Sequence, residues 1–448
     1  MIVRKIFEKL WSAIRQEYVD ILVGPRHSGK STLFCTLMAK LRSEKMVHDN
    51  RIFYFDFDDI LVRIEFEPVL DAFKKKLEMK LGESLEQLHA PIYLFFDEIQ
   101  TCPEMLPILR ALFQTNPSKI KTFAASSISF KSIQRDNAEF AACSRIIELP
   151  PLSLNELICH YMNPLQGNST ITSIINRELD ADIFRELQTL VQEKREAILR
   201  LFELVVLFGG MPEVMLQDDV DQKWAATQQS LRDYFEKDIH PLSQIADLKK
   251  YNQILKILSI HNGELFNILN ICDDYGLNRN TVRKYISTME ETFVLDFVNP
   301  YLEDDVKKVV MRTPKLFFRN NGWVHYWAGY RQFEALQNSN RLQPSLEGVL
   351  YHNLICHAKL TGEPVDIRFL KDYQNHSLDF LICRDNELIP VGICYDLNTQ
   401  KNKIRNFRYF LKYCPQISQG VLFGNFDTIA IKEMRGSTLF LLPLWMIW

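Results

Sequence analysis

The stretch Gly24-Pro25-Arg26-His27-Ser28-Gly29-Lys30-Ser31 decides the fold, because it fits the phosphate-binding pattern G-x-x-x-x-G-K-S/T at every fixed position. A short apolar segment over residues 20–23 precedes it, and an amphipathic segment over residues 32–38 follows it. This order predicts a strand, a loop and a helix. The free N–H groups of the loop and of the helix N-terminus form a nest for phosphate oxygens. The sequence therefore predicts an α/β fold built on a phosphate-loop core.

The residues of this loop are expected to share the work of binding a nucleotide. Glycine at positions 24 and 29 allows an approach of the backbone that a Cβ would block. We expect Lys30 to reach the β- and γ-phosphates and the Ser31 hydroxyl to bind Mg²⁺. The candidate cofactor-binding residues are Gly24, Pro25, Arg26, His27, Ser28, Gly29, Lys30, Ser31 and Thr32.

A second motif, Pro91-Ile92-Tyr93-Leu94-Phe95-Phe96-Asp97-Glu98, is an apolar run that ends in two acids. It predicts a buried parallel strand with carboxylates at its C-terminal end, where ligands bind in open α/β sheets. We expect Asp97 to hold Mg²⁺ and Glu98 to orient or deprotonate the attacking water. The alternative is that both acids are solvated residues that end a strand. The chain has no N/T-K-x-D tetrapeptide to read guanine, so ATP is favoured.

Composition limits the class of protein. A chain of 448 residues is too long for one core and should form two to four domains. The formal net charge of −3 excludes a global basic field, so a nucleic-acid contact would need a local patch. Nine cysteines show no C-x-x-C pair or zinc-ligand spacing, and no secretory signal peptide is evident. These features favour a cytoplasmic protein with reduced thiols.

Residues 20–150 alternate apolar and amphipathic segments, which predicts a parallel sheet with helical crossovers. The fourth strand ends at Ser126-Ser127, and the Ser127 hydroxyl either lies beside the γ-phosphate or simply ends the strand. Arg145 opens the fifth strand, where it faces a nucleotide of this or a neighbouring subunit, or forms a surface ion pair. The expected strands are 20–24, 51–57, 91–97, 121–126 and 145–149.

Residues 152–245 become helical, with helices expected over 154–161, 183–208 and 223–238. Gly209 and Gly210 stop the second helix, and Pro212 suits the first turn of the next. A helical lid after a phosphate-loop core usually closes over the adenine. Pro212 is therefore included among the candidate nucleotide contacts.

Residues 246–312 predict a winged helix. Amphipathic helices are expected over 266–274 and 279–291 with Gly276 in the turn between them, and an alternating segment over 292–298 would form a wing strand. The second helix offers cations of the kind that contact duplex DNA. The alternative is that it serves only for packing or for protein contact. The candidate DNA-binding residues are Arg279, Arg283 and Lys284.

Residues 313–448 return to a mixed α/β pattern. A helix is expected over 345–360, and strands over 314–318, 365–370, 378–383, 388–395 and 438–442. Glu347 falls on the expected helix and Asp379 inside a strand, followed one strand later by Gly392 and Cys394.

Taken together, these pieces resemble a bacterial and archaeal family of AAA-type ATPases. Its members have a helical lid, a winged helix and a C-terminal restriction-endonuclease-like domain. The resemblance implies an AAA-type core at 1–151, a lid at 152–245, a winged helix at 246–312 and a nuclease-like domain at 313–448. The matching stretches are GPRHSGKST (from Gly24), YLFFDEIQ (from Tyr93), SRIIELPPLSLNEL (from Ser144), FGGMPEV (from Phe208), NRNTVRKYISTMEETFVL (from Asn278), KLFFRNNGW (from Lys315), LEGVLYHNL (from Leu346) and LDFLI (from Leu378).

The C-terminal part departs from that family. Nuclease-like members add an E-x-K pair to the Glu and Asp that Glu347 and Asp379 match, but these positions are Gly392 and Cys394 here. Asn320 likewise stands where the family has Asp. A metal site without these charges would bind Mg²⁺ poorly. The domain is thus expected to be a nuclease relic with no water-activating cation nearby.

These patterns lead to one expected function and two rivals. We expect an ATPase whose nucleotide state repositions the lid, the winged helix and the relic domain. The relic domain is a possible docking surface for a protein partner, and the chain is a possible homo-oligomer. One rival is a nucleotide-gated adaptor that binds DNA or protein with little hydrolysis. The other is a surviving nuclease with a displaced lysine such as Lys401.

Overall fold

The computed structural model describes residues 2–44, 47–65, 69–129, 137–162, 169–240, 245, 247–302, 309–361 and 365–448. The chain forms two compact units. The first, the N-terminal unit, comprises Val3–Pro150 with Glu291–Phe293. The second, the C-terminal unit, comprises Pro151–Glu290 and Val294–Trp448, together with the first two residues.

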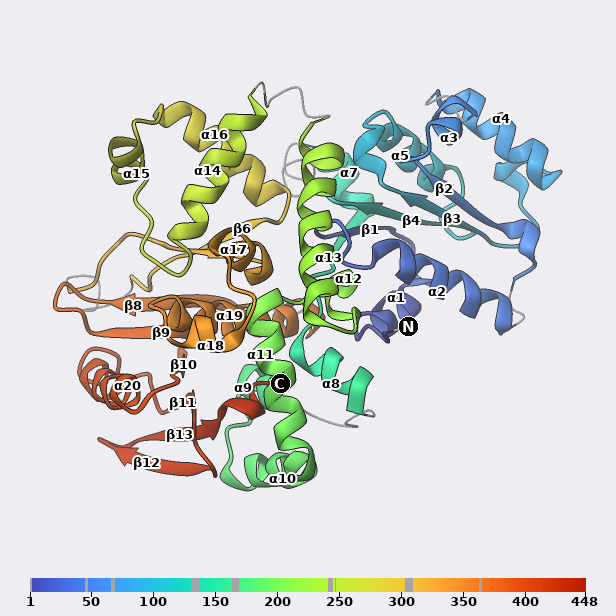
Figure 1. The fold of residues 1–448 in the computed structure, drawn as a ribbon. Coiled ribbons are helices and arrows are strands. Elements are labelled where there is room, and N and C mark those ends of the chain that lie inside the picture. The colour runs from blue at the N-terminus through green and yellow to red at the C-terminus, as the bar shows by residue number, and fades with distance from the viewer. Residues whose placement is uncertain are drawn as a thin grey trace. The chain divides into compact units, whose positions relative to one another are not determined.

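The N-terminal unit is built on a five-stranded, all-parallel sheet in the order β2-β3-β4-β1-β5 (Figure 1). Every predicted strand is present within one residue at each end. The strands are β1 (Val19–Val23), β2 (Ile52–Asp56), β3 (Ile92–Asp97), β4 (Ile120–Ser126) and β5 (Ser144–Glu148). Strands β1, β3 and β4 are buried along their whole length, and β3 is an apolar run up to Asp97 in the sequence. The predicted α/β fold class is confirmed.

Helices cover both faces of this sheet (Figure 1). Neighbouring residues of β3 point to opposite faces, so Phe95 packs with Phe34 of α2 and Phe96 packs with Phe73 of α4. The aromatic pairs anchor one helix on each side of the strand whose end carries the two acids. The helices are α1 (Phe7–Ala13), α2 (Lys30–Ser43), α3 (Ile60–Glu65), α4 (Leu70–Leu81), α5 (Met105–Thr115) and α7 (Ala138–Cys143).

The C-terminal unit begins with helices. The expected helix over 183–208 is two helices, because a 3-10 turn at Gln192–Lys194 separates α10 from α11. This break was not predicted, since the turn contains neither Gly nor Pro. The first helices are α8 (Leu154–Met162), α9 (Thr170–Asn176), α10 (Ala181–Val191), α11 (Arg195–Phe208), α12 (Pro212–Met215) and α13 (Val220–Asp233), which continues as a π-helix over Tyr234–Ile239.

Three further helices and a hairpin follow. The helices are α14 (Leu248–Ile260), α15 (Ile268–Tyr275) and α16 (Arg279–Glu291). The strands β6 (Leu295–Val298) and β7 (Lys315–Phe318) pair antiparallel. Tyr251, Val282 and Leu316 belong to the core that these elements share. The predicted wing strand is therefore present, but it begins at Leu295 rather than at residue 292.

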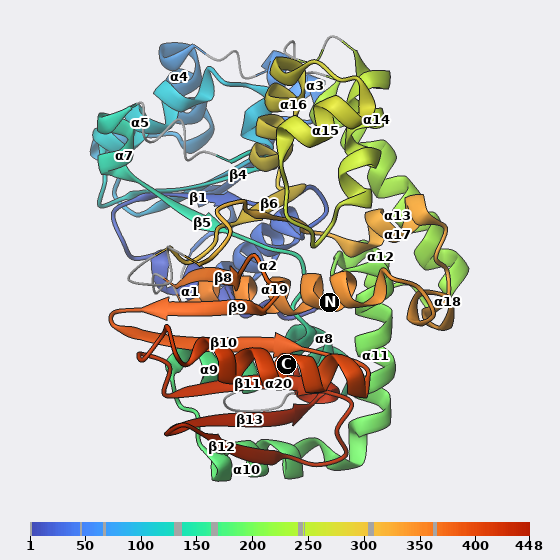
Figure 2. The same cartoon turned by 90° about the vertical axis from the view of Figure 1, so that its left-hand side faces the viewer.

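The last part of the chain forms a six-stranded sheet in the order β12-β13-β11-β10-β9-β8, with α20 across one face (Figure 2). The elements are α17 (Asn321–Ala328), α18 (Phe333–Gln337), α19 (Leu342–Thr361), β8 (Asp366–Lys371), β9 (Ser377–Arg384), β10 (Glu387–Ile393), α20 (Leu397–Phe410), β11 (Gln419–Gly424), β12 (Ala430–Met434) and β13 (Ser437–Pro443). Strands β10, β11 and β13 run parallel. The sequence did not predict α17, α18, α20, β11 or β12.

Close packing explains the two glycines after α11. Gly209 has φ +74°, and a Cβ there would lie 1.9 Å from Asn320 Oδ1. A Cβ on Gly210 would lie 2.3 Å from the carbonyl oxygen of Leu152. Asn320 Oδ1 also accepts a hydrogen bond from Gly322 N at 3.0 Å, which caps α17. An Asn caps a helix as well as an Asp does, so its presence at position 320 leaves the fold intact.

None of the helices in the described ranges combines the length and apolarity that a membrane-spanning helix needs.

Candidate nucleotide-binding site

The phosphate loop lies between the end of β1 and the start of α2. Gly29 has φ +98° and stands at the N-cap of α2, a backbone conformation that favours glycine. Gly24 has a different reason. A Cβ on Gly24 would lie 2.2 Å from the carbonyl oxygen of Leu149, so the loop packs directly on the backbone that follows β5. Position 24 therefore requires glycine for packing within the protein, in addition to any contact with phosphate.

Lys30 is 3% exposed, and its side chain folds back onto the phosphate loop. Its Nζ donates to the carbonyl oxygens of Gly24 and Pro25, each at 3.1 Å, and lies 3.9 Å from Glu98 Oε1. The Ser28 hydroxyl is buried and has no hydrogen-bond partner among the described residues. A phosphate bound here would accept from Lys30 and Ser28, so the loop fits the group that the motif predicts.

Ser31 and Asp97 meet at the ends of α2 and β3. A hydrogen bond from Ser31 and one from Tyr54 Oη at 2.7 Å reach the Asp97 carboxylate. Burial raises the pKa of Asp97, and the charge of Glu98 adds to this, while the hydrogen bonds and Lys30 act in the opposite direction. A hydroxyl and a carboxylate are the hard oxygen ligands that Mg²⁺ prefers. These residues therefore fit the predicted metal.

Glu98 is 8% exposed and has a left-handed backbone conformation, with φ 52° and ψ 46°. Such a conformation is unfavourable for a non-glycine residue and is often found at functional sites. Arg26 Nη2 lies 3.4 Å from Glu98 Oε2, and Arg26 Nη1 lies 2.9 Å from Asp58 Oδ2. Arg26 was predicted as a phosphate contact. In this structure its guanidinium contacts the catalytic candidate.

Gln100 is a site residue that sequence reasoning missed. Its Nε2 donates to the Glu98 carboxylate and, at 2.9 Å, to Ser127 Oγ. Its Oε1 accepts from the Ser127 backbone N–H at 3.3 Å. The amide thus joins the acid after β3 to the serine after β4. Its place two residues after Glu98 was visible in the sequence, but only the geometry shows which groups it joins.

The remaining predicted residues lie as follows. His27 is in the loop with φ 65°, and Thr32 is in the first turn of α2. Pro212 occupies the first turn of α12, as predicted, but in the C-terminal unit. Its contact with a nucleotide stays a prediction.

Arg145 does not join the phosphate loop of its own chain. Its Nε donates to Asp20 Oδ1 at 2.7 Å, and Lys121 Nζ binds the same carboxylate at 2.6 Å. Asp20 lies at the start of β1, whereas the phosphate loop follows the end of that strand. The structure therefore favours the ion-pair alternative over a nucleotide contact in the same subunit. A contact with a neighbouring subunit's nucleotide stays a prediction.

In the C-terminal unit, Glu347 and Asp379 lie together with two lysines. Lys315 Nζ lies 3.0 Å from Glu347 Oε2, and Lys403 Nζ lies 3.3 Å from Glu347 Oε1 and forms an ion pair with Asp379. Burial alone would raise the pKa of Glu347, but the two ammonium groups lower it to about 2. We call these four residues the charge cluster. The expectation that these acids have no cation nearby was wrong.

The E-x-K positions contribute little to this cluster. A Cβ on Gly392 would lie 3.2 Å from Asp379 Oδ2, so the strand passes directly against that carboxylate. Burial raises the pKa of the Cys394 thiol to about 12, and its Sγ lies 3.5 Å from the Phe423 carbonyl oxygen. The thiol therefore stays protonated in the core. Lys401, suggested as a displaced lysine, is exposed, and Lys403 is the residue that reaches the acids.

The predicted DNA-binding residues of α16 are all exposed: Arg279, Arg283 and Lys284. Asp273 and Asp274 of the preceding helix are exposed too, so the surface carries both signs of charge.

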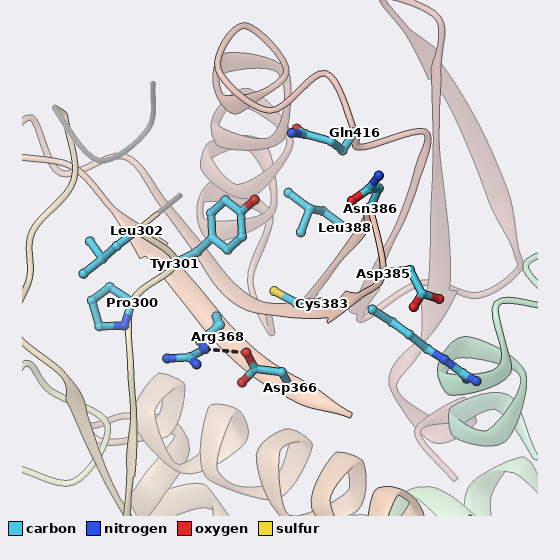
Figure 3. Close-up of a pocket in the computed structure, with 11 residues that line it drawn as sticks. Pro300, Tyr301, Leu302, Asp366, Arg368, Cys383, Asp385, Asn386, Leu388 and Gln416 are labelled. Atoms are coloured by element: carbon cyan, nitrogen blue, oxygen red, sulfur yellow. Dashed lines mark hydrogen bonds and ion pairs between the residues drawn. The ribbon is translucent and has the colours of Figure 1, made fainter. Parts of the chain in front are cut away.

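A separate cavity of about 680 Å³ lies beside the β9–β10 turn (Figure 3). Tyr301 and Cys383 line it, and Arg368 Nε pairs with Asp366 at 2.8 Å on one wall. None of the predicted site residues is among its described lining residues.

Comparison with known families agrees with this geometry. Residues 16–158 match the model of the AAA domain. Residues 199–334 match a domain of unknown function (DUF8612). The second match runs from α11 to α18 and, apart from Glu291–Phe293, lies within the C-terminal unit.

Two curated relatives are similar over most of the chain. An uncharacterized protein of Methanocaldococcus jannaschii is 22% identical over 401 residues, which cover 88% of this chain and 78% of that protein. An uncharacterized protein of Mycobacterium tuberculosis is 21% identical over 374 residues, which cover 84% of this chain and 69% of that protein. Neither name indicates a function.

Solved structures show only weak similarity. The Orc1 protein of Aeropyrum pernix in complex with DNA has a TM-score of 0.30 at 13% identity, over 75% of this chain and 94% of that chain. AMPPCP-bound DnaA of Aquifex aeolicus has a TM-score of 0.24 at 13% identity, over 65% of this chain and 90% of that chain. Scores this low support no transfer of function.

Proposed function

We propose that the protein binds ATP with Mg²⁺ and hydrolyses it to ADP and phosphate. One observation carries this proposal. Lys30, Ser31, Asp97 and Glu98, from two distant parts of the sequence, come together at the C-terminal ends of β1 and β3. Ligands of open α/β sheets bind at these strand ends. The match of residues 16–158 to the AAA domain supports the same conclusion.

Each residue then has a role that its contacts allow. Lys30 exchanges the carbonyl oxygens of its own loop for the β- and γ-phosphates. Ser31 and Asp97 hold Mg²⁺, which when bound neutralises the charge of the phosphate oxygens. Glu98 accepts a proton from the attacking water, and the Ser127 hydroxyl binds the γ-phosphate. For this step Glu98 must leave Arg26, whose Nη2 lies 3.4 Å from Glu98 Oε2.

The test compares ATP binding with ATP turnover in the full-length protein. Lys30→Ala should abolish tight binding in calorimetry. Glu98→Gln should bind ATP normally and turn it over on the order of 10² to 10⁴ times more slowly. The control is Glu86→Gln, an exposed acid of the same unit, which should behave like wild type. If wild type binds ATP and releases no phosphate, the nucleotide-gated adaptor replaces the ATPase.

We further propose that nucleotide state repositions the lid, the winged helix and an inactive nuclease-like domain, with boundaries at 152, 246 and 313. The start of the C-terminal unit at Pro151 supports the first boundary. The three helices and the hairpin over 248–318 support the second boundary but argue against the third, because β7 lies after residue 313 and pairs with β6. The exposed cations of α16 support a contact with duplex DNA. A protein partner and homo-oligomerisation stay proposals. The nine free cysteines support a reducing compartment, as in the cytoplasm.

The charge cluster supports the loss of nuclease activity for a new reason. Lys315 and Lys403 already neutralise both carboxylates, so a divalent cation would have to displace two ammonium groups. Lys403 is also the displaced lysine that a surviving nuclease would need. Incubation of the protein with plasmid DNA and Mg²⁺ or Mn²⁺ distinguishes an active nuclease from an inactive domain. Cleavage that Asp379→Ala abolishes would establish a nuclease, whereas intact plasmid would support an inactive domain.

A further inference from the structure

Arg4 lies far from the phosphate loop in the sequence but contacts it in the structure. Its side chain is buried, with 8% of the residue exposed, and it belongs to the N-terminal unit. Its Nη1 donates to the carbonyl oxygen of Ser28 at 2.6 Å, and its Nη2 donates to the carbonyl oxygen of Pro150 at 2.7 Å. One guanidinium therefore joins the loop to the segment that follows β5.

The contact with Ser28 orients a peptide group of the loop. A trans peptide is planar, and its C=O and N–H point in opposite directions. Because Arg4 holds the Ser28 carbonyl oxygen, the N–H of Gly29 in the same peptide must point away from Arg4. Gly29 is the N-cap of α2, where free N–H groups bind phosphate oxygens. Glycine adopts many backbone conformations, so this peptide needs an external group to hold it.

The contact with Pro150 fixes the other side of the loop. Leu149 N donates to Val23 O at 2.7 Å, and the missing Cβ of Gly24 leaves room for the Leu149 carbonyl oxygen. The segment over 149–150 therefore packs against the phosphate loop, beginning at Gly24. Pro150 is also the last residue of the N-terminal unit before the chain continues into the C-terminal unit.

We propose that Arg4 is a positioning residue for nucleotide binding, which holds the Ser28–Gly29 peptide with its N–H toward the phosphates and ties that peptide to Pro150. The proposal rests on the proposed ATP site. A guanidinium is suited to this role because its planar fork serves two carbonyl oxygens at once. A lysine ammonium is a single point charge on a flexible stem and does not reproduce this fork.

The test uses the full-length protein with the variants Arg4→Lys and Arg4→Ala. Arg15→Lys is the matched control, since Arg15 is an exposed arginine of the same N-terminal segment. Arg4→Lys should weaken ATP binding about 10- to 100-fold, the effect of losing a hydrogen bond from a charged group. The KM for ATP should rise while kcat at saturation stays within about twofold, because Glu98 and Ser127 are untouched. Arg15→Lys should bind like wild type.

The outcomes separate this inference from the proposed function. If wild type itself fails to bind ATP, the proposed function fails. If wild type binds ATP and Arg4→Lys binds equally well, the inference about Arg4 is overturned while the ATP site stands. Circular dichroism and thermal unfolding without nucleotide show whether each variant folds. An Arg4→Lys chain that does not fold would assign Arg4 to stability alone and would also overturn the proposal.

Discussion

Replacement of Lys403 by methionine tests the charge cluster most directly. The ammonium of Lys403 contacts both carboxylates, of which Asp379 is 2% exposed and Glu347 is 7% exposed. Without it, Lys315 still neutralises Glu347, but Asp379 keeps a buried charge with the Ile393 N–H at 3.1 Å. Removing one partner of a buried ion pair costs about 3 to 5 kcal/mol. We expect the lower value, because Asp379 can take up a proton.

This protonation has a defined pH dependence. Burial and the charge of Glu347 raise the pKa of Asp379 in the wild-type protein, and loss of Lys403 should raise this pKa further. A carboxyl whose pKa is higher in the folded than in the unfolded state binds more protons when folded. The free energy of unfolding therefore falls as pH rises through the folded pKa. The variant should be closer to wild type at pH 5 than at pH 8.

Tryptophan fluorescence during heating provides the assay, since five of the six tryptophans lie in the C-terminal unit. A loss of about 3 kcal/mol in a unit of this size should lower its Tm by roughly 5 to 10 °C. Asp379→Asn combined with Lys403→Met should recover most of this loss, because no buried charge is left unpaired. Lys401→Met, two positions away and exposed, is the control. If Lys403→Met unfolds at the same temperature as Lys401→Met, the argument from a buried cluster is refuted.

Three further predictions concern other parts of the molecule. Gln100→Ala should lower kcat about tenfold without changing ATP affinity, since Glu98 loses the amide that holds it; equal kcat in the variant and in the exposed control Gln87→Ala would contradict this. Burial lowers the pKa of His325 to about 4, so the free energy of unfolding should fall by at most about 3 kcal/mol as pH falls from 6.5 to 4. In urea titrations, His325→Gln should reduce this dependence on pH. An unchanged pH dependence in the variant would contradict the prediction. Removing three cations of α16 should reduce the salt dependence of DNA binding by about three units of log–log slope, whereas the same change on α14 should not; failure of wild type to bind duplex DNA would exclude the contact. The residues changed to alanine are Arg279, Arg283 and Lys284 on α16, and Lys249, Lys250 and Lys256 on α14.

Elements that bury a continuous apolar run were predictable. The five strands of the N-terminal sheet were predicted within one residue. The clearest case is β3, which is buried along its whole length and is apolar up to Asp97, as is typical of a parallel strand covered on both faces. Helix α20 was missed because its sequence, LNTQKNKIRNFRYF, is mostly polar, although Ile404, Phe407 and Phe410 have helical spacing. One signal was available: Asp396 precedes it and accepts hydrogen bonds from the N–H groups of Asn398 and Thr399, as an N-cap does.

The sequence by itself determined the chemistry of the candidate site. Lys30 and Ser31 follow a glycine loop, and Asp97 and Glu98 end an apolar strand, so a short pattern specifies both the backbone and the reactive groups. Only the tertiary structure decided the partners of these groups. It brings Arg4 to Ser28, Gln100 to Ser127 and Lys403 to Asp379, and it takes Arg145 to Asp20. Hydrogen bonds and ion pairs form only within about 3 to 4 Å, and the periodicity of one segment does not encode which distant segment comes that close.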